Sequence, residues 1–159
     1  HESPVRTLAR AGISPEEIDE IILTHAHSDH IDGLRYYPHA RVYLHENERE
    51  EAAPYLLPTQ TVICFSDLTE LAPGVRIRPI CGHTDGSSVV ELDTPDGPLV
   101  LCGDECYHRD CFTYPAESGG SRNRENTLAF FSRYGKDCTP ILFHDPDLVG
   151  FLGYKILCQ

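Results

Sequence analysis

The sequence has few basic residues, and this shortage excludes two classes of partner. Thirteen Lys and Arg stand against 25 Asp and Glu, so the formal charge is −12 at pH 7. Nucleic acids and anionic membrane surfaces attract basic faces, and we therefore expect neither as a main partner. The sequence also lacks an apolar run near the roughly 18 residues of a transmembrane helix. No signal-peptide pattern opens the chain.

Methionine is absent, even at position 1. We therefore expect that the chain begins inside a longer gene product or has lost residues to processing. Its 159 residues, 40% of them hydrophobic and 24% charged, are ordinary for one soluble globular domain. The expected domain spans residues 1–159, and the sequence leaves the oligomeric state open.

A C-x-x-C pair is absent as well, although the chain has seven cysteines. The absence excludes a zinc ribbon and a thioredoxin-like motif. Several cysteines stand in apolar runs, such as 62–65 and 99–102, where a free thiol acts as a small buried hydrophobe. We expect a protein of the reducing cytoplasm without disulfide bonds.

Apolar periodicity and turn residues predict short helices that alternate with short strands. Helices are predicted over 3–12, 14–18, 31–34, 46–53 and 126–135. Ser14 and Asn126 are the predicted caps of two of them, and Pro54 is predicted to stop another. Strands are predicted over 21–24, 41–45, 61–65, 75–80, 88–92, 99–102 and 139–144. The remaining predictions are a hairpin turn at 95–97, a flexible surface loop at 118–121, and an edge strand or terminal turn at 153–158.

A ligand-dense loop follows the apolar run 21–23. It holds three histidines and a carboxylate within six residues: His25, His27, Asp29 and His30. Imidazole suits zinc, iron, cobalt or nickel, and an Asp among the ligands suits a site that also binds water. The pattern indicates a metal at the rim of a sheet. The alternative is a histidine-rich surface loop, which three later signals disfavour.

Three further ligand-type residues end predicted strands: His83, Asp104 and His144. Each of them alone would be an ordinary core histidine or turn aspartate. Together with the first loop they supply five His and two Asp at the same relative place on their strands. Two divalent metals that share one bridging carboxylate need about that set.

These motifs make the sequence similar to the metallo-β-lactamase superfamily of metallohydrolases. The pattern of that family is H-x-H-x-D-H, then G-H-T, G-D and a late His, and all four occur here in this order within residues 12–145. The resemblance implies an α/β fold, the αββα sandwich of that family. It also implies two metals with one shared carboxylate and a hydroxide between them: His25, His27 and His83 for the first, Asp29, His30 and His144 for the second, and Asp104 as the bridge. Zinc is the expected metal, with iron, manganese or cobalt as alternatives.

Within the superfamily the sequence most resembles N-acyl homoserine lactonases. Those enzymes place a Tyr three residues after the bridging Asp, as Tyr107 follows Asp104 here, and segment 11–19 is also similar. The resemblance implies hydrolysis of a small lactone, with the Tyr107 phenol facing the metals and binding the substrate. Asp29 or Asp104 would shuttle the proton. The alternative for Tyr107 is a packing tyrosine after a strand.

The sequence departs from the family pattern in several places. Asp85 and Asp32 add carboxylates near the motifs and could alter substrate preference, and the Cys106 thiol could tune or inhibit the metals. Only 24 residues precede the histidine loop, so we expect that part of the N-terminal sheet is missing or reduced.

Two other functions remain open on the sequence alone. One is thioester hydrolysis of the glyoxalase II type, which uses the same ligands but usually needs basic residues for glutathione. The other is a metal-binding domain without catalysis, or an incomplete piece of a larger enzyme.

Overall fold

The computed structural model describes residues 3–135 and 137–145, and the chain divides after Phe65 into two compact units. Among the described residues no helix has the length and apolar composition to cross a bilayer. The expectation that residues 1–159 act as one domain stays a prediction.

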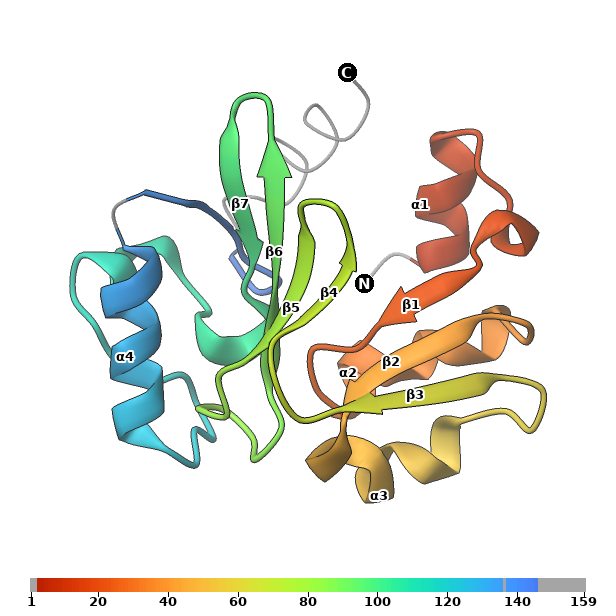
Figure 1. The fold of residues 1–159 in the computed structure, drawn as a ribbon, viewed down its shortest axis with the longest axis horizontal. Helices are drawn as coiled ribbons and strands as arrows, with labels where there is room; N and C mark the ends of the chain where they lie inside the picture. Colours follow the sequence, from red (N-terminus) through yellow and green to blue (C-terminus); the bar gives the residue numbers. More distant parts are fainter. Residues whose placement is uncertain (1–2, 136, 146–159) are drawn as a thin grey trace. The chain divides into compact units, whose positions relative to one another are not determined.

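The first unit is a small parallel sheet with short helical connections (Figure 1). Its strands are β1 (Glu20–Ile22), β2 (Arg41–His45) and β3 (Thr61–Phe65), in the order β1-β2-β3. Parallel neighbours need crossover connections, which the helical segments supply. The connection from β1 to β2 contains α2 (Ser28–Ile31) and η2 (Asp32–Tyr36), and the connection from β2 to β3 contains η3 (Glu46–Glu48), α3 (Arg49–Ala52) and η4 (Ala53–Tyr55). Two further helical segments, α1 (Pro4–Arg10) and η1 (Pro15–Glu17), precede β1.

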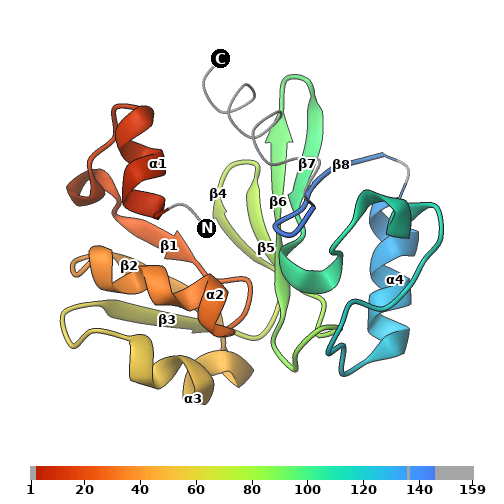
Figure 2. The ribbon, with the colours of Figure 1, turned by 180° about the vertical axis from the view of Figure 1, so that it is seen from behind.

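The core of the first unit lies between this sheet and the α2 segment, which Figure 2 shows in front of the strands. Ile31 and Leu34 stand three residues apart and share one helical face. Val42 and Leu44 alternate on one face of β2. All four side chains are buried in one cluster with Leu23, Ala26 and Ala52.

The second unit is a mixed sheet with one long helix. The strand order is β4-β5-β6-β7-β8, and every pair is antiparallel except β7 with β8. The bounds are β4 (Thr69–Ala72), β5 (Val75–Pro79), β6 (Ser88–Thr94), β7 (Gly97–Leu101) and β8 (Thr139–Ile141). Helix α4 (Arg124–Tyr134) and two turns, η5 (Gly103–Glu105) and η6 (Arg109–Phe112), lie between β7 and β8 in the chain. The core is one buried cluster of Val89, Val100, Cys102, Cys106, Phe130, Phe131, Tyr134 and Leu142.

Most predicted helices and strands are present. Where the ends of a strand differ from the prediction, its pairing with the neighbouring strand sets them. The predicted strands 41–45 and 61–65 are confirmed as β2 and β3. The strand predicted over 139–144 ends earlier, because its parallel pairing with β7 stops at Leu101 and Ile141. The strand predicted over 21–24 is β1, a half-exposed edge strand that ends at Ile22. Strand β4, which pairs with β5, was not predicted.

The helix predictions need two corrections. Helix α4 is capped by Asn123, whose Oδ1 accepts the Asn126 backbone N–H at 3.1 Å, so Asn126 is not the cap. The predicted polar helix 46–53 is three short segments, and Pro54 lies inside the last of them, η4. The capping box at Ser14 and Glu17 is confirmed.

The predicted lack of disulfide bonds agrees with the part of the chain that the structure describes, while the predicted cytoplasmic location stays a prediction. All six cysteines there are free thiols. Cys158 and the element predicted over 153–158 lie outside the described residues.

A buried ion-pair network fastens α4 to the second sheet. Glu91 on β6 accepts hydrogen bonds from Arg78 Nε at 2.7 Å, Arg76 Nε at 3.1 Å and Tyr134 Oη at 2.7 Å. Burial alone would raise the pKa of Glu91, but the hydrogen bonds from Arg78, Tyr134 and Arg76 outweigh it and lower this pKa to about 2. The network therefore stabilises the folded state only while Glu91 is ionised.

This network predicts a pH-dependent stability. The pKa of Glu91 is lower in the folded chain than the usual value near 4.3, so its contribution is complete above about pH 5 and is lost as the pH falls through about 2. Glu91→Gln should lower the free energy of unfolding at pH 7 by on the order of 2 kcal/mol. Urea unfolding followed by circular dichroism from pH 7 to pH 2 measures this loss, and the variant should show a shallower decline.

Asp93→Asn is the matched control, because exposed Asp93 bonds the same Arg76. It should cost less stability than Glu91→Gln. Equal pH slopes for wild type and Glu91→Gln would contradict the assignment.

Candidate metal centre

The histidine loop is the junction between a strand and a helix. Strand β1 ends at Ile22, and Leu23 N–H still donates to Tyr43 O at 2.9 Å before the chain leaves the sheet. Helix α2 begins at Ser28, and the His27 carbonyl accepts the N–H of His30 at 2.9 Å. Asp29 and His30 therefore stand on the first turn of α2, which begins three residues before the predicted helix 31–34.

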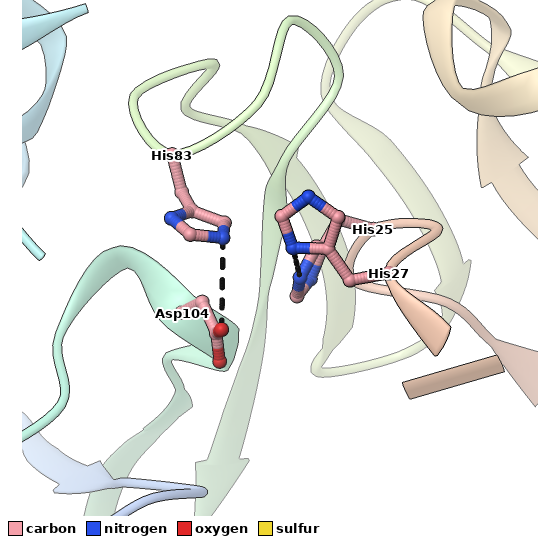
Figure 3. Close-up of side chains that lie close together, drawn as sticks. All are labelled: His25, His27, His83 and Asp104. Carbon is pink, nitrogen blue, oxygen red and sulfur yellow. Dashed lines mark hydrogen bonds and ion pairs between the residues drawn. The ribbon is translucent and has the colours of Figure 1, made fainter. Parts of the chain in front are cut away.

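The first unit brings three of the predicted histidines together. His25 Nε2 lies 3.0 Å from His27 Nδ1 (Figure 3), and the ring centroids of His25 and His30 are 4.2 Å apart. His25 is fully buried. Two imidazole nitrogens on a tetrahedral zinc lie roughly 3.3 Å apart, given Zn–N bonds near 2.05 Å. The spacing of His25 and His27 thus suits shared ligation. Asp29 Oδ2 lies 3.7 Å from His30 Nε2 on the same helix turn.

A buried glutamate holds this loop by its backbone. Glu48, at the end of η3, is only 3% exposed, and its Oε2 accepts the N–H of Ala26 at 2.8 Å. Ala26 stands between His25 and His27, so this bond fixes the peptide that connects two predicted ligands. Glu48 was not predicted as a functional residue, because in the sequence it resembles any other polar residue of a charged segment.

The second unit brings together the other three predicted ligands. His83 stands in the loop between β5 and β6, Asp104 in η5 directly after β7, and His144 in the loop after β8. Asp104 is 4% exposed. Its Oδ2 lies 3.6 Å from His83 Nε2 (Figure 3), and its Oδ1 lies 3.3 Å from His144 Nε2. Each carboxylate oxygen thus faces a different histidine.

Glu105 holds the His83 loop in place. Its Oε1 accepts the backbone N–H of Gly82 at 3.2 Å and of His83 at 3.1 Å, and it also accepts the Ser87 hydroxyl. Burial raises the pKa of this carboxyl group, and the three hydrogen bonds oppose that shift. Glu105 follows Asp104 directly, so one stretch of chain carries a ligand and the anchor of a second ligand loop.

Ser118 orients the His83 ring. Its hydroxyl lies 3.2 Å from His83 Nδ1, which leaves Nε2 to face Asp104. The sequence predicts a flexible surface loop at 118–121, but Ser118 is only 8% exposed. Ser121 and the two residues after it bond the Gly82 carbonyl, which ties this loop to the His83 loop. The surface-loop prediction is therefore wrong for Ser118.

Tyr107 lies beside two predicted ligands. Its ring centroid is 5.0 Å from that of His144 and 6.1 Å from that of His83, in edge-on arrangements. The phenol O–H donates to Gly119 O at 3.0 Å. The side chain is half-buried. Its role in catalysis stays a prediction.

The three residues that could tune the site have structural partners of their own. Exposed Asp32 pairs with Arg35, and exposed Asp85 pairs with Arg122 at 3.0 Å. Cys106 is 1% exposed in the core of the second unit, where its thiol donates to His108 O. Burial raises the pKa of this thiol to about 12. The Cys106 side chain therefore packs as a small hydrophobe.

Comparison with known proteins identifies the family. The model of the metallo-β-lactamase superfamily matches residues 2–137. The chain therefore belongs to the metallo-β-lactamase superfamily, and the α/β fold expected from its motifs is confirmed.

The relatives include enzymes of two descriptions. An N-acyl homoserine lactonase of a Bacillus species is 30% identical over 96% of this chain and 65% of its own length. The N-acyl homoserine lactonase AiiB of Agrobacterium fabrum is 28% identical over 87% of this chain and 60% of its own length. A probable metallo-hydrolase of Mycobacterium tuberculosis is 26% identical over 92% of this chain and 61% of its own length. The chain thus spans between 60% and 65% of the length of these relatives.

Solved structures agree on the fold. An N-acyl homoserine lactone hydrolase with N-hexanoyl-L-homoserine at its metal centre superimposes with a TM-score of 0.71, at 21% identity over 98% of this chain and 64% of that chain. A putative metallo-β-lactamase of Thermotoga maritima gives a TM-score of 0.70, at 20% identity over 88% of this chain and 73% of that chain.

Close packing in the His83 loop leaves little room for a side chain at position 82. A Cβ atom on Gly82 would lie 2.3 Å from Glu105 Oε2 and 2.6 Å from Thr127 Oγ1. Gly82→Ala should therefore lower the free energy of unfolding by about 1–3 kcal/mol, the usual cost of overpacking. Thermal unfolding followed by circular dichroism measures it.

Gly33→Ala is the control for that substitution. A Cβ atom there meets only Pro4 Cγ, at 3.4 Å. The control should cost much less stability, and equal losses at the two glycines would contradict the close packing at Gly82.

Proposed function

We propose that this protein is a metal-dependent hydrolase that attacks the ester carbonyl of a lactone. The observation that carries the proposal is the Asp104 carboxylate, whose two oxygens face His83 and His144 separately within the second unit. A buried carboxylate placed in this way suits a bridge between two cations.

The seven ligands are allotted as the family motifs suggest: His25, His27 and His83 to the first metal, Asp29, His30 and His144 to the second, and Asp104 to both. Five imidazoles and two carboxylates suit zinc, and they also accept iron, manganese or cobalt. Within each unit the ring contacts and ion pairs already group these residues.

The metals would supply Lewis acidity and a water of lowered pKa. The chain supplies the groups that orient the substrate and move protons. Tyr107, whose ring lies beside those of His83 and His144, would donate its phenol hydrogen bond to the oxygen that becomes negative during attack. That hydroxyl would exchange its Gly119 partner for the substrate. Asp29, whose side chain is 40% exposed, can pass a proton to the leaving alkoxide, and Asp104 is the alternative.

A lactone is the proposed substrate class for two reasons. Tyr107 stands three residues after Asp104, as in lactonases, and two of the relatives described above are named N-acyl homoserine lactonases. A thioester is the rival substrate, because the same ligands serve it. Assays of purified protein on a panel of N-acyl homoserine lactones and glutathione thioesters separate the two, and turnover of thioesters alone would sink the lactonase proposal.

We also propose that the protein works in a reducing compartment, with the cytoplasm as the simplest choice. The six described cysteines are all free, and several of them pack in the core. Oxidising compartments favour disulfides among so many thiols.

Replacement of Asp104 tests the metal bridge. Asp104→Ala should remove at least one of two metal equivalents and lower kcat/KM by at least roughly 10³-fold, since bound metals contribute several kcal/mol to catalysis. Elemental analysis of protein purified without added metal, together with a lactone assay, measures both effects. Asp85→Asn is the control, because this exposed carboxylate pairs with Arg122. Full activity and metal content in Asp104→Ala would overturn the proposal.

Replacement of Tyr107 tests the phenol. Tyr107→Phe should lower kcat by about 10²-fold, the usual cost of one lost donor to an oxyanion, while the metal content stays unchanged. Tyr114→Phe is the control, because Tyr114 is 77% exposed. Unchanged kcat in Tyr107→Phe would leave this tyrosine a packing role only.

A further inference from the structure

Each unit contains a buried glutamate that is not among the proposed ligands but bonds the backbone of a ligand loop. Glu48 is 3% exposed and Glu105 is fully buried. Burying a carboxylate costs free energy unless hydrogen bonds repay it. In both cases the donors are backbone N–H groups of a loop that carries predicted ligands.

Glu48 accepts a hydrogen bond from a peptide N–H group that lies beyond the end of strand β1. Ala26 is 2% exposed and stands past the last residue of β1, where the strand ladder no longer supplies an acceptor. Its N–H donates to Glu48 Oε2 at 2.8 Å. Without this acceptor a buried N–H would lack a partner, and the peptide between His25 and His27 would turn to find one.

Glu105 gathers three donors on one oxygen. The N–H groups of Gly82 and His83 and the hydroxyl of Ser87 all reach its Oε1. A shift of the Glu105 carboxylate would therefore move the backbone at Gly82 and His83. Glu105 also packs closely against Gly82, since a Cβ atom there would lie 2.3 Å from Glu105 Oε2.

We propose that Glu48 and Glu105 are positioning residues that hold their ligand loops in the metal-binding conformation before metal arrives. The inference rests on the proposed function, in which His25, His27 and His83 are ligands of the same metal. Both glutamates then act on the binding of that first metal. Loss of either glutamate should lower the affinity for the first metal. The affinity for the metal of Asp29, His30 and His144 should change much less.

The first experiment compares metal affinities of apo protein in a chelator competition with Zn²⁺. Glu48→Leu and Glu105→Leu should each lower the affinity for one of the two bound Zn²⁺ ions by roughly 10- to 100-fold. This is the usual effect of removing a residue that holds a metal ligand in place. Glu48→Gln and Glu105→Gln keep an acceptor oxygen and should bind nearly as well as wild type. The far-ultraviolet circular dichroism of each apo variant establishes that it is folded.

Glu91→Gln is the matched control. Glu91 is also a buried glutamate with several donors, but those donors are Arg76, Arg78 and Tyr134. This variant should lose stability and keep both metal affinities. A merely structural role for Glu48 and Glu105 would make their variants behave in the same way.

A second experiment assigns the weakened metal. His144→Ala removes a ligand of the second metal and should leave one tightly bound Zn²⁺ ion. Adding Glu105→Leu or Glu48→Leu to that variant should weaken the remaining equivalent by the same roughly 10- to 100-fold. If a Leu variant does not fold, Glu48→Asp or Glu105→Asp replaces it, because the shorter side chain withdraws the carboxylate from the loop.

The outcomes separate the two proposals. If wild type binds two metals and the folded Leu or Asp variants bind them as tightly, the positioning role is wrong while the metal centre stands. If wild type binds no divalent metal, the proposed function itself fails.

Discussion

The buried Asp104 carboxylate is the group on which the site in the second unit depends. A carboxylate that is 4% exposed must be compensated, and its two oxygens face His83 at 3.6 Å and His144 at 3.3 Å. The chain reaches this position because β7 ends at Leu101 and turns at once into η5. Strand β8 lies parallel to β7 and carries His144 to the same end of the sheet. Sheet register therefore decides which histidines the carboxylate meets.

Carboxylates have three distinct roles in this fold. Asp104 faces imidazoles and is a proposed ligand. Glu48 and Glu105 accept backbone N–H groups and hold ligand loops. Glu91 accepts from two arginines and a tyrosine and fastens α4 to the sheet. The donors that surround each carboxylate separate these roles, since the residue type alone does not.

The predictions from sequence succeeded where the signal was local. Strands β2 and β3 follow from short runs of β-branched and aromatic residues, and their predicted bounds are confirmed. Predictions failed where a distant partner decides. Leu142 continues an apolar run, but the strand ends at Ile141 because β7 offers no further partner. Asn123 and Asn126 are equally good caps by composition, and only the helix geometry selects Asn123. Ser118 sits in a Ser- and Gly-rich stretch typical of an exposed loop, yet its hydroxyl contacts His83.

By itself the sequence determined the family, the α/β alternation and the residue types able to bind metal, because motif spacing and apolar periodicity are properties of neighbouring residues. The tertiary structure decided how those residues are used. It faced the two oxygens of Asp104 toward different histidines, buried Cys106 in the core, and set Glu48 and Glu105 behind the ligand loops. These choices depend on contacts between residues far apart in the chain, such as the 22 positions that separate Ala26 from Glu48. Every residue except proline has the same backbone N–H group, so the sequence alone contains no sign of which of them a buried carboxylate will meet.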